Sequence, residues 1–406
     1  MHNGNPRSKE ISCIIYSHEM SNRNGGEMYS HNLDIRGGTE QRNYGIDFLR
    51  VIAMYSIVLG HAIPVDYSRV GAIDIQHASL SPWRLFLDIF SFNGQFSNNI
   101  FLVCSAWYLV DKGEVKRRKL ENLVADNVAI SLVFLIIFLA AGFELPMKLI
   151  VKQFFPMTME YYWYISCYFF LYLFHPWLNI IINHTSKKQL LILSILFLAI
   201  YGFAGLFNRG IYYRTDLMGF IEVYFLTGYF KKWVQLEKYD FKKLAVEAGI
   251  GNIAILLFAN FFSILTGVPS GPFAVLRVFT NPVLVFESIL VFLVFLNLEW
   301  NAGNKTKRII GFLSGLSMYI FCIHRNVLVR DYFQHPLFDR LSKYYVSDFI
   351  EVCIVLAYGV ASIIFSTIMA SIYKWLIHPV NNYIMAKLDG ICWTMAKHVY
   401  DKIYEK

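Results

Sequence analysis

The sequence predicts an all-α, polytopic membrane protein with about ten transmembrane helices and both termini in the cytoplasm. Three observations support this prediction. Of the 406 residues, 56% are hydrophobic and only 16% are charged, whereas a soluble globular domain carries about 25% charged residues. The apolar residues gather in runs of about 20, the length that a helix needs to cross a bilayer. The basic residues gather in alternate connecting segments, as expected of cytoplasmic loops.

The two ends of the chain differ from the apolar middle. Residues 1–43 are polar, with one apolar patch at Ile11–Tyr16 that is too short for a signal peptide or a span, so a disordered cytoplasmic tail is predicted. Residues 380–406 carry apolar side chains at helical spacing with lysines between them. This pattern predicts an amphipathic helix on the cytoplasmic membrane face, although packing against the chain's own loops would explain it equally. Residues 44–379 form the predicted membrane domain.

Ten apolar runs within that domain predict the transmembrane helices. Separated single runs can satisfy their backbone hydrogen bonds in a bilayer only as helices. The predicted spans are Gly45–Pro64, Leu85–Val110, Asn127–Phe143, Tyr162–Ile182, Leu190–Leu206, Leu217–Lys232, Leu244–Thr266, Asn281–Leu298, Ile309–Val329 and Phe349–Ile377.

The connecting loops predict the orientation and exclude other classes. Basic residues dominate the loops after the even-numbered spans, most densely at Lys112–Lys119, and the positive-inside rule places these loops in the cytoplasm. The formal net charge of +8 is therefore mainly a sign of topology, and no nucleic-acid partner is predicted. The six cysteines are scattered without metal-ligand spacing, so no metal site is predicted either.

The first span carries three ionisable residues, Asp47, Arg50 and His61. The separation of Arg50 and His61 returns the helix to within ~20° of the same face, three turns and ~16 Å further on. Asp47 lies one turn before Arg50 and can pair with it. Ionisable residues inside a membrane usually mark a functional site. Anchoring of Asp47 and Arg50 at the interface, with His61 emerging into water, would explain the spacing equally well.

Several segments resemble the membrane-bound acyltransferase-3 family. The Arg and His of Ile46–His61 are similar to that family's opening motif. FLVCSAWYL (Phe101–Leu109) resembles its second span, Tyr161–Pro176 its Trp-Tyr span and Leu313–Leu328 its late Ser, Tyr and His signature, while Pro379 stands where the family has a terminal Pro. The segments follow the family's order, which is more specific than any one motif.

Two positions depart from the family pattern. Ala106 replaces the usual Gly, and His378 stands where many members carry an acid before the Pro. These departures affect the local structure and the choice of subfamily, and they do not affect the resemblance to the family.

The resemblance implies roles for the residues of the first two spans. His61 would be the general base toward an acceptor hydroxyl, with a transient acyl-His61 as the competing version. Arg50, with Asp47 beside it, would bind the phosphates of acyl-CoA. Ser105 would donate a hydrogen bond to the thioester carbonyl, or serve only as a small residue at a helix contact.

Further candidates lie in the outer halves of later spans. Glu222 and His324 are predicted to be catalytic, and Glu287 to bind substrate, because ionisable groups at one depth suggest an outward-facing polar cavity. Trp163 and Tyr164 are predicted to form a wall for a sugar substrate. Burial against neighbouring helices would explain the acids and His324, and an aromatic interfacial belt would explain the Trp-Tyr pair.

These features together predict an O-acyltransferase of the cell (inner) membrane. The expected donor is acetyl-CoA, and the expected acceptor is a hydroxyl of a cell-surface glycan or its lipid-linked precursor. A secondary transporter or flippase is the first alternative, but no internal repeats or paired broken helices are visible. A glycan polymerase or ligase is the second, and it usually has a larger outer loop. The acceptor sugar, the acyl group and the oligomeric state are not predicted.

Overall fold

The computed structural model describes residues 42–69, 82–159, 162–203, 216–266, 280–298 and 301–387. The chain divides into two compact units, Met1–Arg42 and Asn43–Lys406. Almost all of the predicted disordered tail lies outside the described residues. Within the described part of the second unit every regular element is a helix, which confirms the predicted all-α class.

Helix α1 (Tyr44–Arg69) lies inside the bundle. Asn43 begins it, since its Oδ1 accepts a hydrogen bond from the Ile46 N–H at 3.0 Å. The helix start is packed closely, because a Cβ added at Gly45 would lie 2.3 Å from the carbonyl oxygen of Phe295. The helices that pack against α1 include α2 (Pro82–Leu109), α10 (Pro282–Leu296), α11 (Asn304–Ser314), α12 (Ser317–Arg325) and α15 (Asp348–Ile372).

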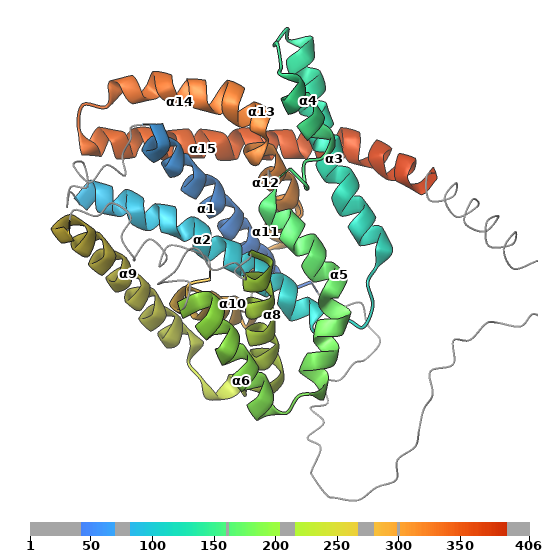
Figure 1. Ribbon diagram of the computed structural model, residues 1–406, viewed down its shortest axis with the longest axis vertical. Coiled ribbons are helices and arrows are strands. Elements are labelled where there is room, and N and C mark those ends of the chain that lie inside the picture. Colours follow the sequence, from blue (N-terminus) through green and yellow to red (C-terminus); the bar gives the residue numbers. More distant parts are fainter. Residues whose placement is uncertain are drawn as a thin grey trace, which may run out of the picture. The chain divides into compact units, whose positions relative to one another are not determined.

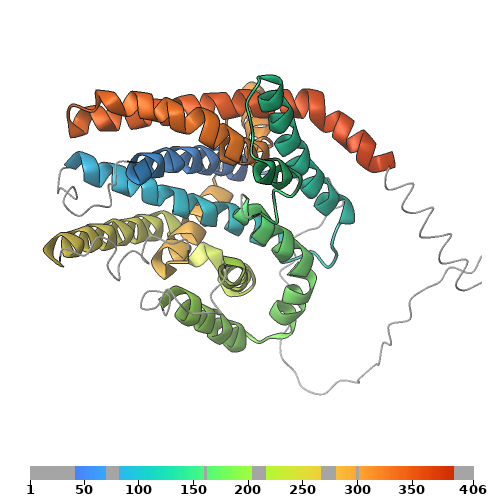
Figure 2. The ribbon, with the colours of Figure 1, turned by 45° about the horizontal axis from the view of Figure 1, so that its top comes forward.

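Figure 1 shows α1 and α2 running side by side below α15, and the turned view in Figure 2 shows the same order. A second group of helices lies on the far side of α2. Its helix α8 packs against α2, α5 and α6, and its helix α9 packs against α10. This second group consists of α5 (Trp163–His184), α6 (Lys187–Phe197) with the π-helix η2 (Leu198–Phe203), α8 (Asp216–Trp233) and α9 (Phe241–Thr266).

A third group flanks α12. Helix α3 (Arg117–Ala140) packs against α12 and against α4 (Met147–Phe154). The chain leaves α12 through short elements that lead to α15. These are α13 (Val327–Val329), η5 (Arg330–Gln334), α14 (His335–Leu341) and η6 (Ser342–Tyr344).

Every predicted span falls on one or more of these helices, but fewer helices meet a strict test for crossing a membrane. By length and hydropathy, four segments of the described chain could cross: Tyr44–Ala62, Arg117–Ala140, Trp163–His184 and Asp348–Lys387. The pair α11 and α12 would add a fifth. The membrane-protein class is therefore supported, and the number ten remains a prediction.

The last two predicted spans differ from the sequence expectation in ways that bear on the site. The ninth predicted span is broken into α11 and α12, which meet at a bend of 42°. The last span is longer than predicted, because one helical segment continues from Asp348 to Lys387. Residues 380–387 therefore extend that helix, and the rest of the predicted amphipathic helix lies outside the described residues.

Candidate functional site

A cavity of about 230 Å³ lies between α1, α2, α3, α5 and α12. The contribution of α1 is a single stripe of Arg50, Met54 and Ile57, four and then three residues apart. This spacing keeps side chains on one helix face. The cavity is therefore lined by the helix face that the sequence singled out.

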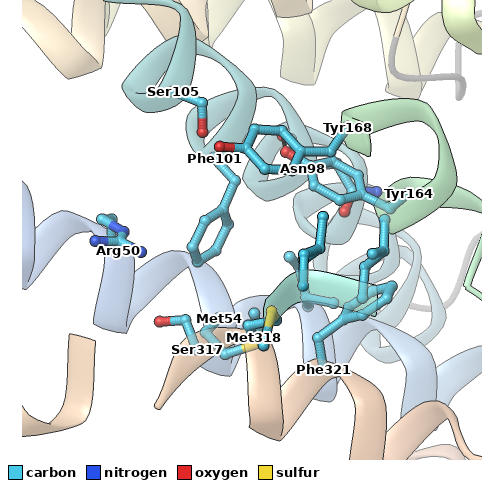
Figure 3. A pocket seen from close by; sticks show the side chains of 13 residues that line it. Arg50, Met54, Asn98, Phe101, Ser105, Tyr164, Tyr168, Ser317, Met318 and Phe321 are labelled. Carbon is cyan, nitrogen blue, oxygen red and sulfur yellow. Dashed lines mark hydrogen bonds between the residues drawn. The ribbon is translucent and has the colours of Figure 1, made fainter. Parts of the chain in front are cut away.

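The other walls are mostly apolar, and Figure 3 shows their side chains surrounding the space. On α12, Ser317 and Phe321 lie one turn apart and face α1 across the cavity, with Met318 beside them. The remaining lining residues are Asn98, Phe101, Ser105, Leu123, Tyr164, Ile165 and Tyr168.

Two histidines meet one turn beyond this cavity. His61 Nδ1 lies 2.8 Å from His324 Nε2, and the two rings stack with centroids 5.0 Å apart and an interplanar angle of 28°. Both side chains line a second, much smaller pocket of about 20 Å³. The structure thus joins two of the three residues predicted to be catalytic.

The hydrogen bonds of the pair define its tautomers. His324 Nδ1 lies 2.9 Å from the carbonyl oxygen of Ile320, which can only accept, so Nδ1 carries a proton. In a neutral ring His324 Nε2 then has a lone pair, and His61 Nδ1 must donate to it. A neutral His61 therefore has its own lone pair on Nε2. This is the arrangement of a general base held by an orienting partner.

The large cavity and the small pocket adjoin along two helices. Ile57 and Phe321 line the large cavity, whereas His61 and His324, one turn further on, line the small pocket. The Phe321 ring meets the His324 ring edge-on, with centroids 5.6 Å apart. Phe321 therefore forms part of the wall between the two spaces.

Arg50 occupies the opposite end of the large cavity. Its guanidinium carbon lies 5.9 Å from the centroid of the Phe101 ring, within cation–π range. Figure 3 shows Ser105 at the same end, away from Phe321. Ser105 thus lines the same cavity as Arg50, whereas the two histidines line the other pocket.

The predicted pairing of Asp47 with Arg50 is wrong. Among the described residues Arg50 forms no ion pair, and Asp47 accepts a hydrogen bond of 2.7 Å from the Ser314 hydroxyl on α11. Residues three apart on a helix differ by about 60° in direction. Different neighbouring helices can therefore hold the two side chains apart.

The predicted Trp-Tyr wall is divided between two layers. Tyr164 lines the cavity, and its hydroxyl donates to the carbonyl oxygen of Asn98 at 3.2 Å. Trp163 does not line the cavity but packs edge-on against Tyr164 and Phe220. Trp163 therefore supports the wall from behind.

The structure does not bring Glu222 or Glu287 to the histidines. Glu222 is completely buried on α8, and neither described cavity includes it among its lining residues. Glu287 on α10 accepts a hydrogen bond from the Asn252 amide of α9 and also lies outside both cavities. Equal depth along the spans was the reason for grouping these acids with His61, and it does not determine which way a helix face points.

Sequence reasoning missed Asp126, because the third span was predicted to begin after it. Helix α3 instead begins at Arg117, and Asp126 is buried inside it with 2% exposure. Its carboxylate accepts from the hydroxyls of Tyr319 and Tyr373 at 3.2 and 2.8 Å. The Asn381 amide and the His378 ring nitrogen complete the set at 2.9 and 3.0 Å.

This hydrogen-bonded cluster ties three elements together behind the cavity wall. It connects α3, α12 and the end of the last helix, and Leu123, one turn before Asp126, lines the cavity itself. A helical period of apolar residues running back from Asn127 toward Arg117 would have been the signal for the earlier helix start.

Other lining residues also escaped sequence reasoning. Met54 could have been predicted from the sequence, because it lies one turn after Arg50 on the same face of α1. Arg325 and Arg330, which line the small pocket, were not among the predicted site residues. No group of three or more His, Cys, Asp or Glu that could hold a metal ion occurs among the residues whose placement is described.

The fold and the site define an all-helical membrane protein with an internal cavity, a cation at one end and a hydrogen-bonded histidine pair at the other. A family model for the acyltransferase domain of the acyltransferase-3 family matches residues 43–371. The chain belongs to this family and is a membrane acyltransferase. Comparisons with curated proteins and with solved structures give no significant match.

Proposed function

We propose that the protein transfers an acyl group, in the first instance acetyl, from acyl-CoA to a hydroxyl of a cell-surface glycan or its lipid-linked precursor. The observation that carries this proposal is the shared face of α1, on which Arg50 lines the large cavity and His61 lines the small pocket one turn beyond it. Arg50, Met54, Ile57 and His61 lie along one face of α1, so a donor bound at Arg50 would extend its thioester toward His61.

The donor fits the end of the cavity that holds Arg50. A guanidinium binds phosphate oxygens in bidentate fashion, and Arg50 has no carboxylate competing for it among the described residues. The apolar stretch formed by Met54, Ile57 and Met318 suits the pantetheine arm and the acyl chain. Ser105 lies at the Arg50 end, where it would contact the polar part of that arm and not the thioester carbonyl.

The chemistry follows from the tautomers of the pair. His61 Nε2 takes the proton of the acceptor hydroxyl while the hydroxyl oxygen attacks the thioester carbonyl carbon. The tetrahedral intermediate then collapses, the C–S bond breaks, and the CoA thiolate takes the proton from the His61 imidazolium. The lone pair of His324 Nε2 accepts from His61 Nδ1 throughout and stabilises the imidazolium.

A covalent acyl-His61 is the alternative route at the same site. His61 Nε2 would attack the thioester carbonyl itself, the CoA thiolate would leave, and the acceptor hydroxyl would then displace the imidazole. Rapid mixing with labelled acyl-CoA in the absence of acceptor separates the routes, because only the covalent route leaves label on the protein.

The path would run from a cytoplasmic donor to an acceptor at the outer face of the cell membrane. This orientation depends on the basic loops, which place the Arg50 end of the first span in the cytoplasm. Acyl-CoA is a cytoplasmic metabolite and the glycan is exported, so a thioester at the end of this path would meet the acceptor.

The test compares strains that carry the wild-type protein, His61→Ala or the exposed control Glu144→Gln. Mass spectrometry of surface glycans should show one acyl mass lost with His61→Ala and retained with Glu144→Gln, at equal protein levels in the membrane. Full acylation by the His61→Ala protein would overturn the proposed mechanism.

A further inference from the structure

The small pocket beside the histidine pair carries two arginines. Arg325 directly follows His324 in the chain, and it lines the pocket with His61, His324 and Arg330. Val58, Ala62, Gln334, Tyr358 and Ser362 complete the lining, so none of the nine lining residues is a carboxylate.

The two arginines differ in their partners. Arg330 is paired with the neighbouring Asp331, with Nε and Oδ1 2.7 Å apart. Arg325 is partly buried, and it has no hydrogen bond or ion pair with any residue that the structure describes. One arginine of the pocket therefore has a carboxylate partner, and the other has none among the described residues.

A partly buried cation without a partner is unfavourable. The cost is greater when a second cation lines the same pocket, because like charges repel most strongly where water is scarce. An anionic group bound between Arg325 and Arg330 would remove both costs. The planar guanidinium matches the paired oxygens of a carboxylate or a phosphate.

We propose that this pocket binds a carboxylate or phosphate group of the acceptor, so that the natural acceptor is an anionic glycan. The pocket holds about 20 Å³, which admits the oxygens of one small group but not a sugar ring. The ring would lie outside, with its hydroxyl at His61 Nε2. The part of this proposal that concerns acyl transfer rests on the proposed function, whereas the binding of the anionic group does not.

The donor's phosphates do not explain these arginines. Arg50 lies at the opposite end of the path, ~16 Å along α1 from His61, while Arg325 adjoins His324. A donor whose phosphates reached Arg325 would leave Arg50 without a ligand and would carry its thioester past the histidines.

A binding experiment without acyl-CoA tests the pocket directly. The full-length protein in lipid nanodiscs is titrated with four probes by calorimetry. One pair is an oligosaccharide of glucuronic acid and its carboxyl-reduced counterpart, and the other is a hexose phosphate and the free hexose. We expect at least one charged probe to bind about tenfold or more tightly than its neutral partner.

Three variants assign that preference to the site. Arg325→Gln should reduce it about tenfold or more, Arg325→Lys should keep part of it, and Arg340→Gln, an exposed arginine on α14, should leave it unchanged. Preference for the uronic acid identifies an acidic sugar, and preference for the hexose phosphate identifies a phosphate-bearing acceptor. Equal binding of charged and neutral probes, or an unchanged preference in Arg325→Gln, would overturn the proposal.

Acyl transfer with the same probes separates this proposal from the proposed function. With labelled acetyl-CoA, Arg325→Gln should lower transfer to the preferred charged probe about tenfold or more relative to its neutral partner. A protein that binds the charged probe through Arg325 but uses no acyl-CoA would overturn the function and leave the anion site. An equal loss with both probes would show a role in the reaction itself and would overturn the anion site.

Discussion

His61 Nδ1 lies 2.8 Å from His324 Nε2, although 263 positions separate the two residues in the chain. The contact joins the first span to the short helix α12, which lies after the bend in the ninth predicted span. Because the Ile320 carbonyl fixes the His324 proton on Nδ1, His61 must donate from Nδ1 and keeps its lone pair on Nε2. In this hydrogen bond His61 is therefore the donor and His324 the acceptor.

The acceptor role of His324 predicts different effects for two substitutions of this residue. His324→Ala should lower kcat about 10²-fold or more, because nothing then holds His61 in the required tautomer. His324→Gln should recover part of the loss, since an amide oxygen can also accept from His61 Nδ1. Steady-state kinetics with acyl-CoA in nanodiscs measures both, and equal activity of the Ala variant and the wild type would exclude the orienting role.

Arg50 should act on the donor alone. Arg50→Ala is expected to raise KM for acyl-CoA by about tenfold or more, since one charge-assisted contact to phosphate is lost, while KM for the acceptor stays unchanged. The KM of Arg50→Lys for acyl-CoA should lie between those of the wild type and Arg50→Ala. Arg117→Ala is the matched control, because Arg117 is exposed and paired with Glu121. An unaltered KM for acyl-CoA in Arg50→Ala would contradict the assignment.

Glu287 should not be needed for catalysis. It accepts from Asn252 between α9 and α10 and lines neither cavity. Glu287→Gln keeps an acceptor oxygen for that contact. Activity should therefore remain within about twofold of the wild type, as expected of a substitution away from the site. Activity lost at an unchanged melting temperature would show that Glu287 reaches the substrate after all.

Asp126 should matter for stability. Asp126→Ala removes the buried acceptor of the Tyr373 hydroxyl and one of the two partners of the Tyr319 hydroxyl, whose other partner is His378 Nδ1 at 3.2 Å. Each unsatisfied buried group costs about 1–3 kcal/mol. We therefore expect a lower melting temperature in detergent micelles, with Glu144→Gln, an exposed carboxylate on a loop, as the control.

Asp126→Asn refines the same prediction. The amide oxygen can still accept from one hydroxyl, but the amide NH2 would face the donors that surround Asp126, so a smaller but measurable loss is expected. A melting temperature equal to the wild type in both variants would show that the cluster contributes nothing to stability.

Much of the fold could be predicted from the sequence, because bilayer crossing imposes long apolar helical runs. Every predicted span falls on helix in the structure, and the stripe of Arg50 and His61 on one face follows from the helical repeat alone. The motifs and their order along the chain pointed to the family that the family model confirms.

The sequence could not assign partners to the ionisable residues. Counting residues from the membrane interface gives the depth of Glu222, Glu287 and His324, but the direction of each side chain depends on how the helices pack. His324 therefore meets His61, whereas Glu287 faces Asn252.

The sequence by itself determined the helices, the membrane class, the family and the face of α1 that lines the two cavities. Only the tertiary structure decided that His324 contacts His61, that the buried Asp126 accepts hydrogen bonds from two tyrosines and that Arg325 shares a pocket with the histidines. The physical reason is that a helix is specified by local hydrogen bonds and hydropathy, whereas a site requires side chains from distant helices, and their packing decides which of them meet.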